Sequence, residues 1–285
     1  MSHNVFQIRI NGSGYSQTAS YFTLESFQAR ISQELIQGSA IAPTLFETTV
    51  RVVSDLQTLA GGEVAYPLHE ALNWHVTRFG QQARATQYAA LLVNEDGSCW
   101  QAKLATPRPK KDKPSEIQKY ETPVGNGSRA YLPALDSLTR LKVAQRYGVH
   151  VPLDESFWNW LEQHPDIPIV LTEGGKKALA GFSQGFVAIA LYGVNGGYRT
   201  KDELGHPIAP VLIPDLVRFA LSGRTCILAF DQDIKVTTRT QVNRAMARLG
   251  QLLQQGGCQV KVAAWNGEAG RCKGMDDLIV HAGAL

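Results

Sequence analysis

Five acidic residues stand at or shortly after the ends of three apolar runs in the second half of the chain: Glu173, Asp231, Asp233, Asp276 and Asp277. Apolar runs of this kind are typical of buried strands, and the carboxyl ends of parallel strands form the sheet edge where ligands bind. Carboxylates gathered at such an edge repel one another unless a divalent cation lies between them. Because oxygen-only ligands suit magnesium or manganese, the sequence predicts a Mg²⁺ (or Mn²⁺) site.

The spacing of these acids suggests a division of roles. Asp231 and Asp233 lie two residues apart just past a strand, so their side chains point to the same side and can share a cation. Asp276 or Asp277 approaches from the loop after a neighbouring strand, and the spacing leaves open which of the two is the ligand. Glu173 precedes two glycines, which let a backbone or a phosphate come close. Since a carboxylate beside others has a raised pKa, Glu173 suits a general acid or base in phosphoryl transfer.

The elements that must position these acids alternate between strand and helix after residue 166. Strands are predicted over residues 168–172, 186–191, 225–230 and 259–264, and helices over 176–182, 214–221, 237–255 and from about 277. Such alternation implies right-handed crossovers and a parallel sheet. We therefore expect an α/β fold in which residues 166–285 form a mostly parallel four-stranded sheet flanked by helices.

Residues 1–165 are expected to form a separate α+β domain. Apolar spacing predicts helices over 23–37 and from 43 to about 59, and the runs 88–93 and 99–104 flank a turn sequence typical of a β-hairpin. Residues 119–123 are interpreted as a returning strand. Further helices are predicted over 135–146 and over the aromatic stretch 156–163, whose rings are expected to pack against the second domain.

Positive charge is concentrated in the first domain. Residues 103–119 hold six lysines and arginines against two acids, a local charge of +4 that exceeds the net charge of +3 for the chain. With Trp100, Tyr120 and Tyr131 interleaved, this segment suits single-strand binding through phosphate contacts and base stacking, although a solvated loop has the same composition. The residues expected to bind nucleic acid or nucleotide here are Lys103, Lys110, Lys111, Lys113, Lys119, Tyr120 and Arg129.

Two lysines that follow Glu173 in the chain are also candidates for binding a nucleotide. Lys176 and Lys177 are placed either to approach a phosphate or simply to cover the first turn of a helix. We include both among the candidate nucleotide-binding residues.

Length and composition describe an ordinary globular protein. The chain has 285 residues, of which 44% are hydrophobic and 19% charged, and two domains are a fair expectation. Its four cysteines form no C-x-x-C pair, which argues against a zinc ribbon or knuckle. No apolar run approaches the roughly 20 residues needed to span a bilayer. The N-terminus lacks the pattern of a signal peptide, so we expect a cytoplasmic protein without a membrane partner.

The order of the acidic motifs resembles a Toprim domain, the metal-binding α/β module of bacterial-type primases, of type IA and type II topoisomerases and of some nucleases. The match consists of Glu173 after one strand, Gly193 after the next, the D-x-D pair at 231–233 after the third and the late pair at 276–277. The resemblance implies that Glu173 is the acid/base and that Asp231 and Asp233 hold magnesium. It places Asp276, better aligned than Asp277, at the third metal position.

Two further resemblances indicate which Toprim-containing proteins the chain is most similar to. Residues 119–123 look like the K-Y-L-x-S/P strand of bacterial primases, in the subdomain that holds template and incoming nucleotide, although Glu121 replaces an apolar residue. The stretches 171–178, 188–197, 228–233 and 273–279 resemble the DUF3854 domain of large plasmid replication proteins of cyanobacteria, as do residues 73–74, 78–80 and 120–129.

These resemblances imply a primase-like nucleotidyltransferase in plasmid DNA replication, acting on single-stranded DNA with nucleoside triphosphates. The chain contains no helicase P-loop of the form G-x-x-x-x-G-K-S/T. A replicative helicase or further domains of a longer replication protein are therefore the expected partners.

Other functions remain open. A Toprim-type nuclease would use the same acids for cleavage, and a non-catalytic DNA-binding replication module would keep the basic segment without binding metal. Residues 228–233 also look like the nucleophile motif of haloacid-dehalogenase-type phosphatases. That family has Thr where this chain has Lys235, and it carries the motif on the first strand rather than the third. A topoisomerase would need a DNA gate and a tyrosine domain that this length scarcely accommodates.

Overall fold

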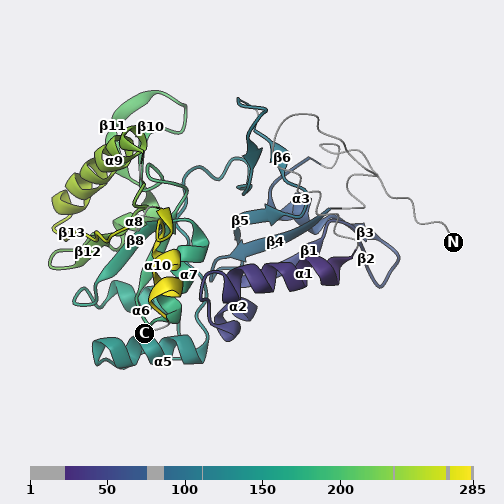
Figure 1. The fold of residues 1–285 in the computed structure, drawn as a ribbon, viewed down its shortest axis with the longest axis horizontal. Helices are drawn as coiled ribbons and strands as arrows, with labels where there is room; N and C mark the ends of the chain where they lie inside the picture. The colour runs from purple at the N-terminus through teal and green to yellow at the C-terminus, as the bar shows by residue number, and fades with distance from the viewer. Residues whose placement is uncertain (1–22, 76–86, 111, 234, 268–269, 284–285) are drawn as a thin grey trace.

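The protein is described by a computed structural model that covers residues 23–75, 87–110, 112–233, 235–267 and 270–283 (Figure 1). The stretch 78–80 and Lys111, which the sequence singled out, lie outside these ranges.

A four-stranded sheet organises the C-terminal half. Its strand order is β13 (Gln259–Val262), β12 (Thr225–Leu228), β8 (Ile169–Glu173) and β9 (Ala188–Leu191), and all three pairings are parallel. β9 is buried throughout and β8 is buried up to Glu173, as expected for strands covered on both faces. The predicted α/β fold with a parallel four-stranded sheet is therefore confirmed.

Helices complete this half. They are α7 (Gly175–Ser183), α8 (Pro214–Val217), α9 (Val236–Gln255) and α10 (Met275–Ala282). The buried residues of α9, among them Val242, Leu249 and Leu253, recur at helical spacing and join the core. An antiparallel hairpin of β10 (Tyr198–Lys201) and β11 (Pro207–Leu212) lies between β9 and α8 in the chain and projects beside α9 (Figure 1).

The N-terminal half contains a three-stranded sheet in the order β1 (Val50–Ser54), β4 (Tyr88–Val93) and β5 (Cys99–Leu104). The predicted hairpin is confirmed by the antiparallel pairing of β4 with β5. Two short ladders add β2 (Gln57–Thr58) with β3 (Val64–Ala65) and β6 (Arg108–Pro109) with β7 (Ile117–Gln118). The helical elements are α1 (Leu24–Ser32), the π-helical turn η1 (Gln33–Gln37), α2 (Pro43–Thr49), α3 (Pro67–Ala71), α5 (Ser137–Tyr147) and α6 (Phe157–Glu162).

The prediction of one helix from residue 43 to about 59 is wrong. The helix α2 ends at Thr49, and strand β1 follows at once. The residues concerned are rich in valine, whose branched side chain fits a pleated strand better than a helix. Val50 pairs with Leu92 and Val52 with Ala90, so the neighbouring strand decides the conformation. The expected strand at 119–123 is reduced to a single bridge between Glu121 and Ala102.

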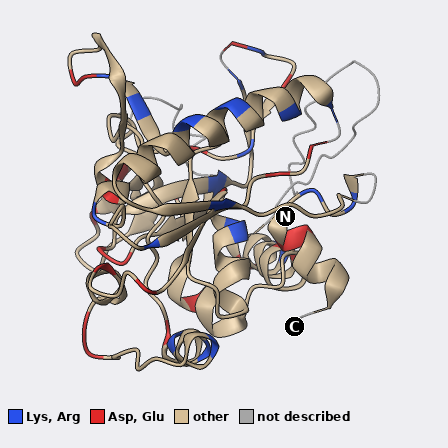
Figure 2. Ribbon diagram, turned by 90° about the vertical axis from the view of Figure 1, so that its left-hand side faces the viewer, with Lys and Arg blue, Asp and Glu red and all other residues tan. Residues whose placement is uncertain are grey.

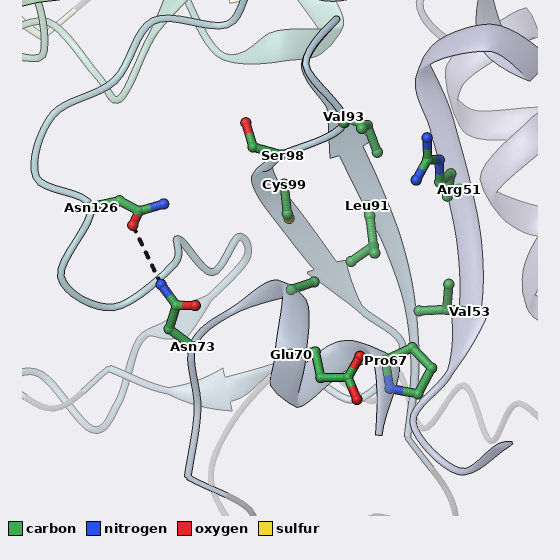
Figure 3. A pocket seen from close by; sticks show the side chains of 12 residues that line it. Arg51, Val53, Pro67, Glu70, Asn73, Leu91, Val93, Ser98, Cys99 and Asn126 are labelled. Carbon is green, nitrogen blue, oxygen red and sulfur yellow. Dashed lines mark hydrogen bonds between the residues drawn. The ribbon is translucent and has the colours of Figure 1, made fainter. Parts of the chain in front are cut away.

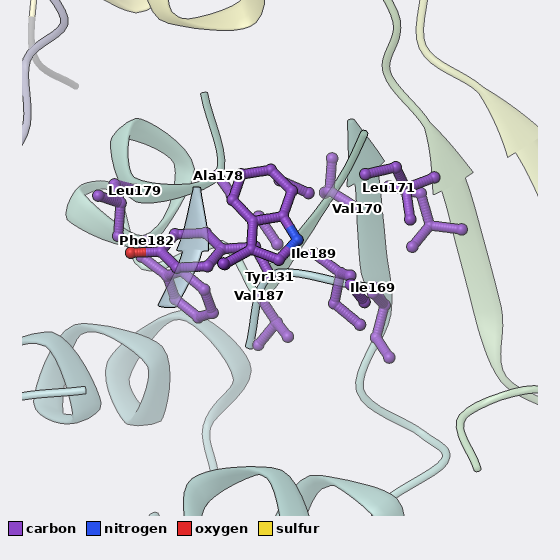
Figure 4. Packing of buried hydrophobic residues seen from close by; sticks show 14 of the residues in the cluster. Tyr131, Ile169, Val170, Leu171, Ala178, Leu179, Phe182, Val187 and Ile189 are labelled. Atoms are coloured by element: carbon purple, nitrogen blue, oxygen red, sulfur yellow. The ribbon is translucent and has the colours of Figure 1, made fainter. Parts of the chain in front are cut away.

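One hydrophobic core joins the two halves of the chain. Trp100 of β5 stacks between Tyr131 and Tyr192, with ring centroids 4.9 and 4.8 Å apart, and the backbone of Tyr131 bridges to Ala190 of β9. Figure 4 shows Tyr131 among residues of β8, α7 and β9. The rings of α6 also contact the C-terminal half, since Phe157 lies against Phe182, which confirms the packing expected of this helix. Within the described residues, no helix combines the length and apolarity required to cross a bilayer.

Candidate active site

Glu173 and Asp231 meet at the carboxyl edge of the parallel sheet. Leu171 of β8 pairs with Leu228 of β12, so the two acids leave adjacent strands two and three residues later. Burial raises the pKa of Glu173 above its ordinary value, and the adjacent Asp231 carboxyl raises it further, while Lys177 acts in the opposite direction. This edge therefore holds a carboxyl group that retains its proton more readily than a solvated glutamate.

Two lysines neutralise this edge. The Nζ of Lys177, on the first turn of α7, lies 2.5 Å from Oδ1 of Asp231 and 3.9 Å from Oε1 of Glu173. The Nζ of Lys273 lies 3.7 Å from Oδ2 of Asp231 and 2.9 Å from Oδ2 of Asp233. Asp231 and Asp233, expected to share a metal ion, thus share the ammonium group of Lys273. Lys273 is not among the site residues predicted from the sequence, although its position three residues before Asp276 is a signal that could have found it.

Asp233 also stands at the start of α9. Its Oδ1 accepts the backbone N–H of Lys235 at 2.9 Å, which is favourable because the N-terminus of a helix carries partial positive charge. The ammonium group of Lys273 and this N–H hold the pKa of Asp233 below its usual range. A backbone bond of 2.9 Å from Gln232 to the carbonyl of Lys273 ties the D-x-D loop to the loop before α10.

The late acidic pair occupies two different environments. Asp276 is fully buried, and its Oδ2 lies 2.7 Å from Nζ of Lys176 and accepts a hydrogen bond of 3.1 Å from Ser39 of the N-terminal half. Its Oδ1 is buried without a hydrogen-bond partner. Asp277 instead accepts the backbone N–H of Gly274 at 2.8 Å and so caps α10. Of the two residues, Asp276 is the one directed into the interior.

Gly274 brings this corner close to the edge formed by Glu173 and Asp231. A Cβ at position 274 would lie 2.5 Å from Oδ1 of Asp276 and 2.7 Å from Cε of Lys177. The stem of Lys177 therefore passes beside Gly274 on its way to Asp231. Only glycine leaves room for this approach.

The donor set suits a hard divalent cation, although it is not a complete cage. Among the described residues, no group of three or more His, Cys, Asp or Glu side chains is close enough to hold a metal ion. Magnesium is usually held by one or two carboxylates together with water and substrate phosphates, so a pair of acids is sufficient on the protein side. Oδ1 of Asp231 and Oδ1 of Asp276 are buried acceptors without hydrogen bonds, although Asp231 Oδ1 faces Lys177. Asp231 with Glu173 or Asp233 is the set that fits Mg²⁺ or Mn²⁺.

The basic segment is more neutral than its sequence suggests. Lys110 and Lys113 pair with Glu116 at 2.6 and 3.2 Å, and Lys103 pairs with Glu34. Downstream, Nε of Arg129 lies 2.7 Å from Asp215. Lys119 is exposed. Exposed ion pairs are weak, so these contacts reduce the local charge without preventing a phosphate from replacing the acid.

Two of the three rings expected to stack on bases are not available for it. Trp100 and Tyr131 have no exposed surface because they form the core between the two halves, so the expectation is wrong for both. Tyr120 is half-buried, and burial followed by the charge of Glu34 raises its pKa to about 12. Its phenol also interacts electrostatically with Lys176 and Asp276. Tyr120 therefore lies near the corner around Asp276, where the two halves of the chain meet.

A pocket of about 500 Å³ lies elsewhere, on the N-terminal sheet (Figure 3). Its lining includes Arg51 of β1, Glu70 of α3 and Asn126, and Asn126 accepts a hydrogen bond of 3.4 Å from Asn73. None of the five candidate acids lines this pocket. The candidate active site is therefore the sheet edge and not the pocket.

The C-terminal half of the chain matches a known protein family. Residues 157–285 match the family described as "Domain of unknown function (DUF3854)". An uncharacterized protein of Picosynechococcus sp. is 33% identical over 290 residues, which cover 95% of this chain and 28% of that protein. The crystal structure of the zinc-binding and RNA polymerase domains of the Aquifex aeolicus primase aligns with a TM-score of 0.44 and 11% identity, over 88% of this chain and 53% of that chain. The chain thus spans less than a third of its curated relative and about half of the solved one. The resemblance to the DUF3854 family is confirmed for residues 157–285.

Proposed function

We propose that this chain is a primase-like nucleotidyltransferase of (plasmid) DNA replication, which extends a strand on a single-stranded DNA template by Mg²⁺- or Mn²⁺-dependent phosphoryl transfer. The observation that supports it best is the pair of carboxyl groups at the sheet edge. The pKa of Glu173 is raised, and the carboxylate of Asp231 faces the ammonium group of Lys177. An acid with a pKa nearer neutrality is suited to exchanging a proton with a hydroxyl group. The adjacent carboxylate and the lysines suit a phosphate held by charge.

Each site residue has its own role in the proposed reaction. Glu173, in its deprotonated form, takes the proton of the 3′-hydroxyl as that oxygen attacks the α-phosphorus of the incoming nucleotide, and pyrophosphate leaves. Asp231, with Glu173 or Asp233, would hold the divalent cation, which would neutralise charge on the phosphate oxygens. Lys177 and Lys273, which neutralise the acids in the structure, exchange these partners for the triphosphate.

The N-terminal half supplies further contacts in this proposal. Lys176 and Tyr120 lie beside Asp276, so a nucleotide at the sheet edge would meet groups from both halves. Single-stranded DNA and nucleoside triphosphates are the proposed partners, with a replicative helicase or further domains of a longer replication protein. A Toprim-type metal site and a cytoplasmic location remain predictions.

Template-dependent primer synthesis tests the proposal. Ribonucleotide incorporation on single-stranded DNA, with Mg²⁺ and with Mn²⁺, is compared between the wild type, Glu173→Gln and Asp231→Asn. Glu203→Gln is the matched control, because Glu203 is exposed in the hairpin between β10 and β11. We expect both site variants to lose product while the control keeps it. Undiminished product in both site variants would reject the assignment.

The same variants separate the other functions. Metal-dependent cleavage of DNA without synthesis, lost in Glu173→Gln and Asp231→Asn, would identify a nuclease. Hydrolysis of a simple phosphomonoester, lost in Asp231→Asn, would identify a phosphatase. Binding of DNA without any turnover would identify a non-catalytic module.

A further inference from the structure

Helix α9 carries positive charge without any acid. Its 20 residues include Arg239, Arg244 and Arg248 but neither Asp nor Glu, and Lys235 directly precedes the helix. These four cations are exposed. Figure 2 shows Lys and Arg along α9 and no acidic residue on it. With Arg199 at the base of the neighbouring hairpin, they form what we call the α9 surface.

The arginines of the α9 surface are not neutralised in the way that the basic segment 103–119 is. In the part of the chain that the structure describes, Arg199, Arg239, Arg244 and Arg248 form no ion pair with an acid. Lys103, Lys110 and Lys113, by contrast, each have a glutamate partner. The acids of the hairpin, Asp202 and Glu203, lie in its connecting loop beyond β10 rather than beside α9. Among the described residues, α9 therefore carries several arginines that no acidic side chain neutralises.

The spacing of these cations suits a strand of phosphates. Arg244 and Arg248 are separated by about 6 Å along the helix axis and lie on the same side of the helix, whereas Arg239, nine residues before Arg248, lies about 180° around the axis from it. Two cations on one side of a helix at this spacing can each contact a phosphate of the same strand. Arginine presents a planar fork that binds phosphate oxygens with two hydrogen bonds. Exposed amide side chains between the arginines, among them Asn243 and Gln251, are additional donors.

The position of α9 connects this surface to the candidate active site. The residue that precedes the helix, Lys235, donates its backbone N–H to Oδ1 of Asp233. Towards its other end, the guanidinium group of Arg248 lies 5.8 Å from the ring centroid of Tyr198, the residue before Arg199. A strand along α9 would thus run between the base of the hairpin and the acidic edge of the sheet.

We propose that the α9 surface binds the phosphate backbone of a single-stranded nucleic acid and leads it to the sheet edge. That the strand is a template rests on the proposed function, whereas the binding rests only on the charge of α9. A lipid surface fits less well, because the apolar face of α9 is already buried in the core. Interfacial helices need such a face to enter the membrane.

Two charge-matched double variants test the surface. Binding of a fluorescein-labelled single-stranded oligonucleotide is followed by anisotropy without metal or nucleotide, between low and moderate salt. Arg244→Gln with Arg248→Gln removes two cations from α9, and Arg30→Gln with Arg51→Gln removes two exposed cations from the N-terminal half. We expect the α9 variant to bind at least tenfold more weakly and to lower the slope of log Kd against log salt by about 1.4, because each phosphate contact in a single strand contributes about 0.7. The variant at Arg30 and Arg51 should bind within about twofold of the wild type.

The contrary results are equally clear. Equal weakening in the two variants, or none in the α9 variant, would overturn the proposal. Tighter binding of the wild type to vesicles containing phosphatidylserine than to the oligonucleotide would assign α9 to a membrane instead. Circular dichroism of both variants checks that they are folded. If the wild type binds DNA through α9 yet synthesises no product, the proposed function is wrong, while the assignment of the α9 surface to nucleic-acid binding is kept.

Discussion

The Nζ of Lys177 lies 2.5 Å from Oδ1 of Asp231, and the same ammonium group is 3.9 Å from Oε1 of Glu173. Lys177 thus supplies, from within the chain, a positive charge at the edge where the acids were expected to hold a metal ion. The side chain is mostly buried, so it cannot swing freely into solvent. A bound divalent cation and Lys177 would compete for the same carboxylate.

Replacing Lys177 by methionine should strengthen binding of Mg²⁺ to the free protein. The variant keeps the unbranched shape and most of the length of the side chain but leaves Asp231 without this positive neighbour, and the repulsion from Glu173 is then relieved by the metal ion. We expect Mg²⁺ to raise the Tm of Lys177→Met by more than it raises that of the wild type, as measured by differential scanning calorimetry. Lys201→Met, an exposed substitution on β10, serves as the control. A smaller Mg²⁺ effect in Lys177→Met would show that the lysine does not compete with the metal.

Glu173→Gln should stabilise the protein at neutral pH. The pKa of Glu173 is raised on folding above its ordinary value of 4.5, so the folded state binds the proton more tightly than the unfolded state. Stability arising from this group is therefore present at low pH and is lost as pH rises through the folded pKa. Urea unfolding should find Glu173→Gln more stable than the wild type at pH 7, with the difference shrinking as pH falls to about 4.5. A gain that is independent of pH would contradict the raised pKa.

Replacing Asp276 tests whether this residue stabilises the fold or binds a metal ion. It is fully buried between Lys176 and Ser39, so Asp276→Ala should lower the free energy of unfolding by about 2–4 kcal/mol, because the remaining groups lose their partner. Ser39→Ala, which removes only one hydrogen bond, should cost about 1 kcal/mol. Both values are obtained from urea unfolding without metal. If Asp276→Ala leaves stability unchanged but abolishes metal-dependent activity, Asp276 is a ligand rather than a link between the two halves.

Gly175→Ala should disturb the site through packing. A Cβ at this position would lie 2.7 Å from Cδ1 of Leu92 and 3.1 Å from Cζ3 of Trp100, both in the N-terminal sheet. Either the Leu92 side chain must repack or α7 must move away from that sheet, at a cost of about 1–3 kcal/mol, and movement of the helix would displace Lys176 and Lys177. Unfolding measurements should find this loss. Gly61→Ala, whose Cβ meets no atom within 4 Å, should leave stability almost unchanged.

The parallel sheet and the place of the acids at the ends of its strands follow from local pattern. The apolar runs before Glu173 and Asp231 are long enough to be buried strands, and their alternation with helices leaves a parallel sheet as the solution. Parallel strands expose their carboxyl ends on one edge, so the meeting of Glu173 and Asp231 could be expected from one-dimensional information. Helix α9 could also be predicted from the sequence, because its apolar residues, which are buried in the structure, recur every three or four positions.

What the remaining residues do depends on neighbours that are distant in the chain. Asp276 and Asp277 are adjacent, yet one is buried against Ser39, 237 positions away, while the other caps its own helix. Trp100 and Tyr131 appear in the sequence as aromatic residues of a basic region, but the stack with Tyr192 places them in the core. Lys103, Lys110 and Lys113 have charge in the sequence and acidic partners in the fold, whereas no acidic side chain neutralises the arginines of α9. Local pattern decides secondary structure because backbone and side-chain preferences act over a few residues, and burial and ion pairing are decided only when distant segments meet.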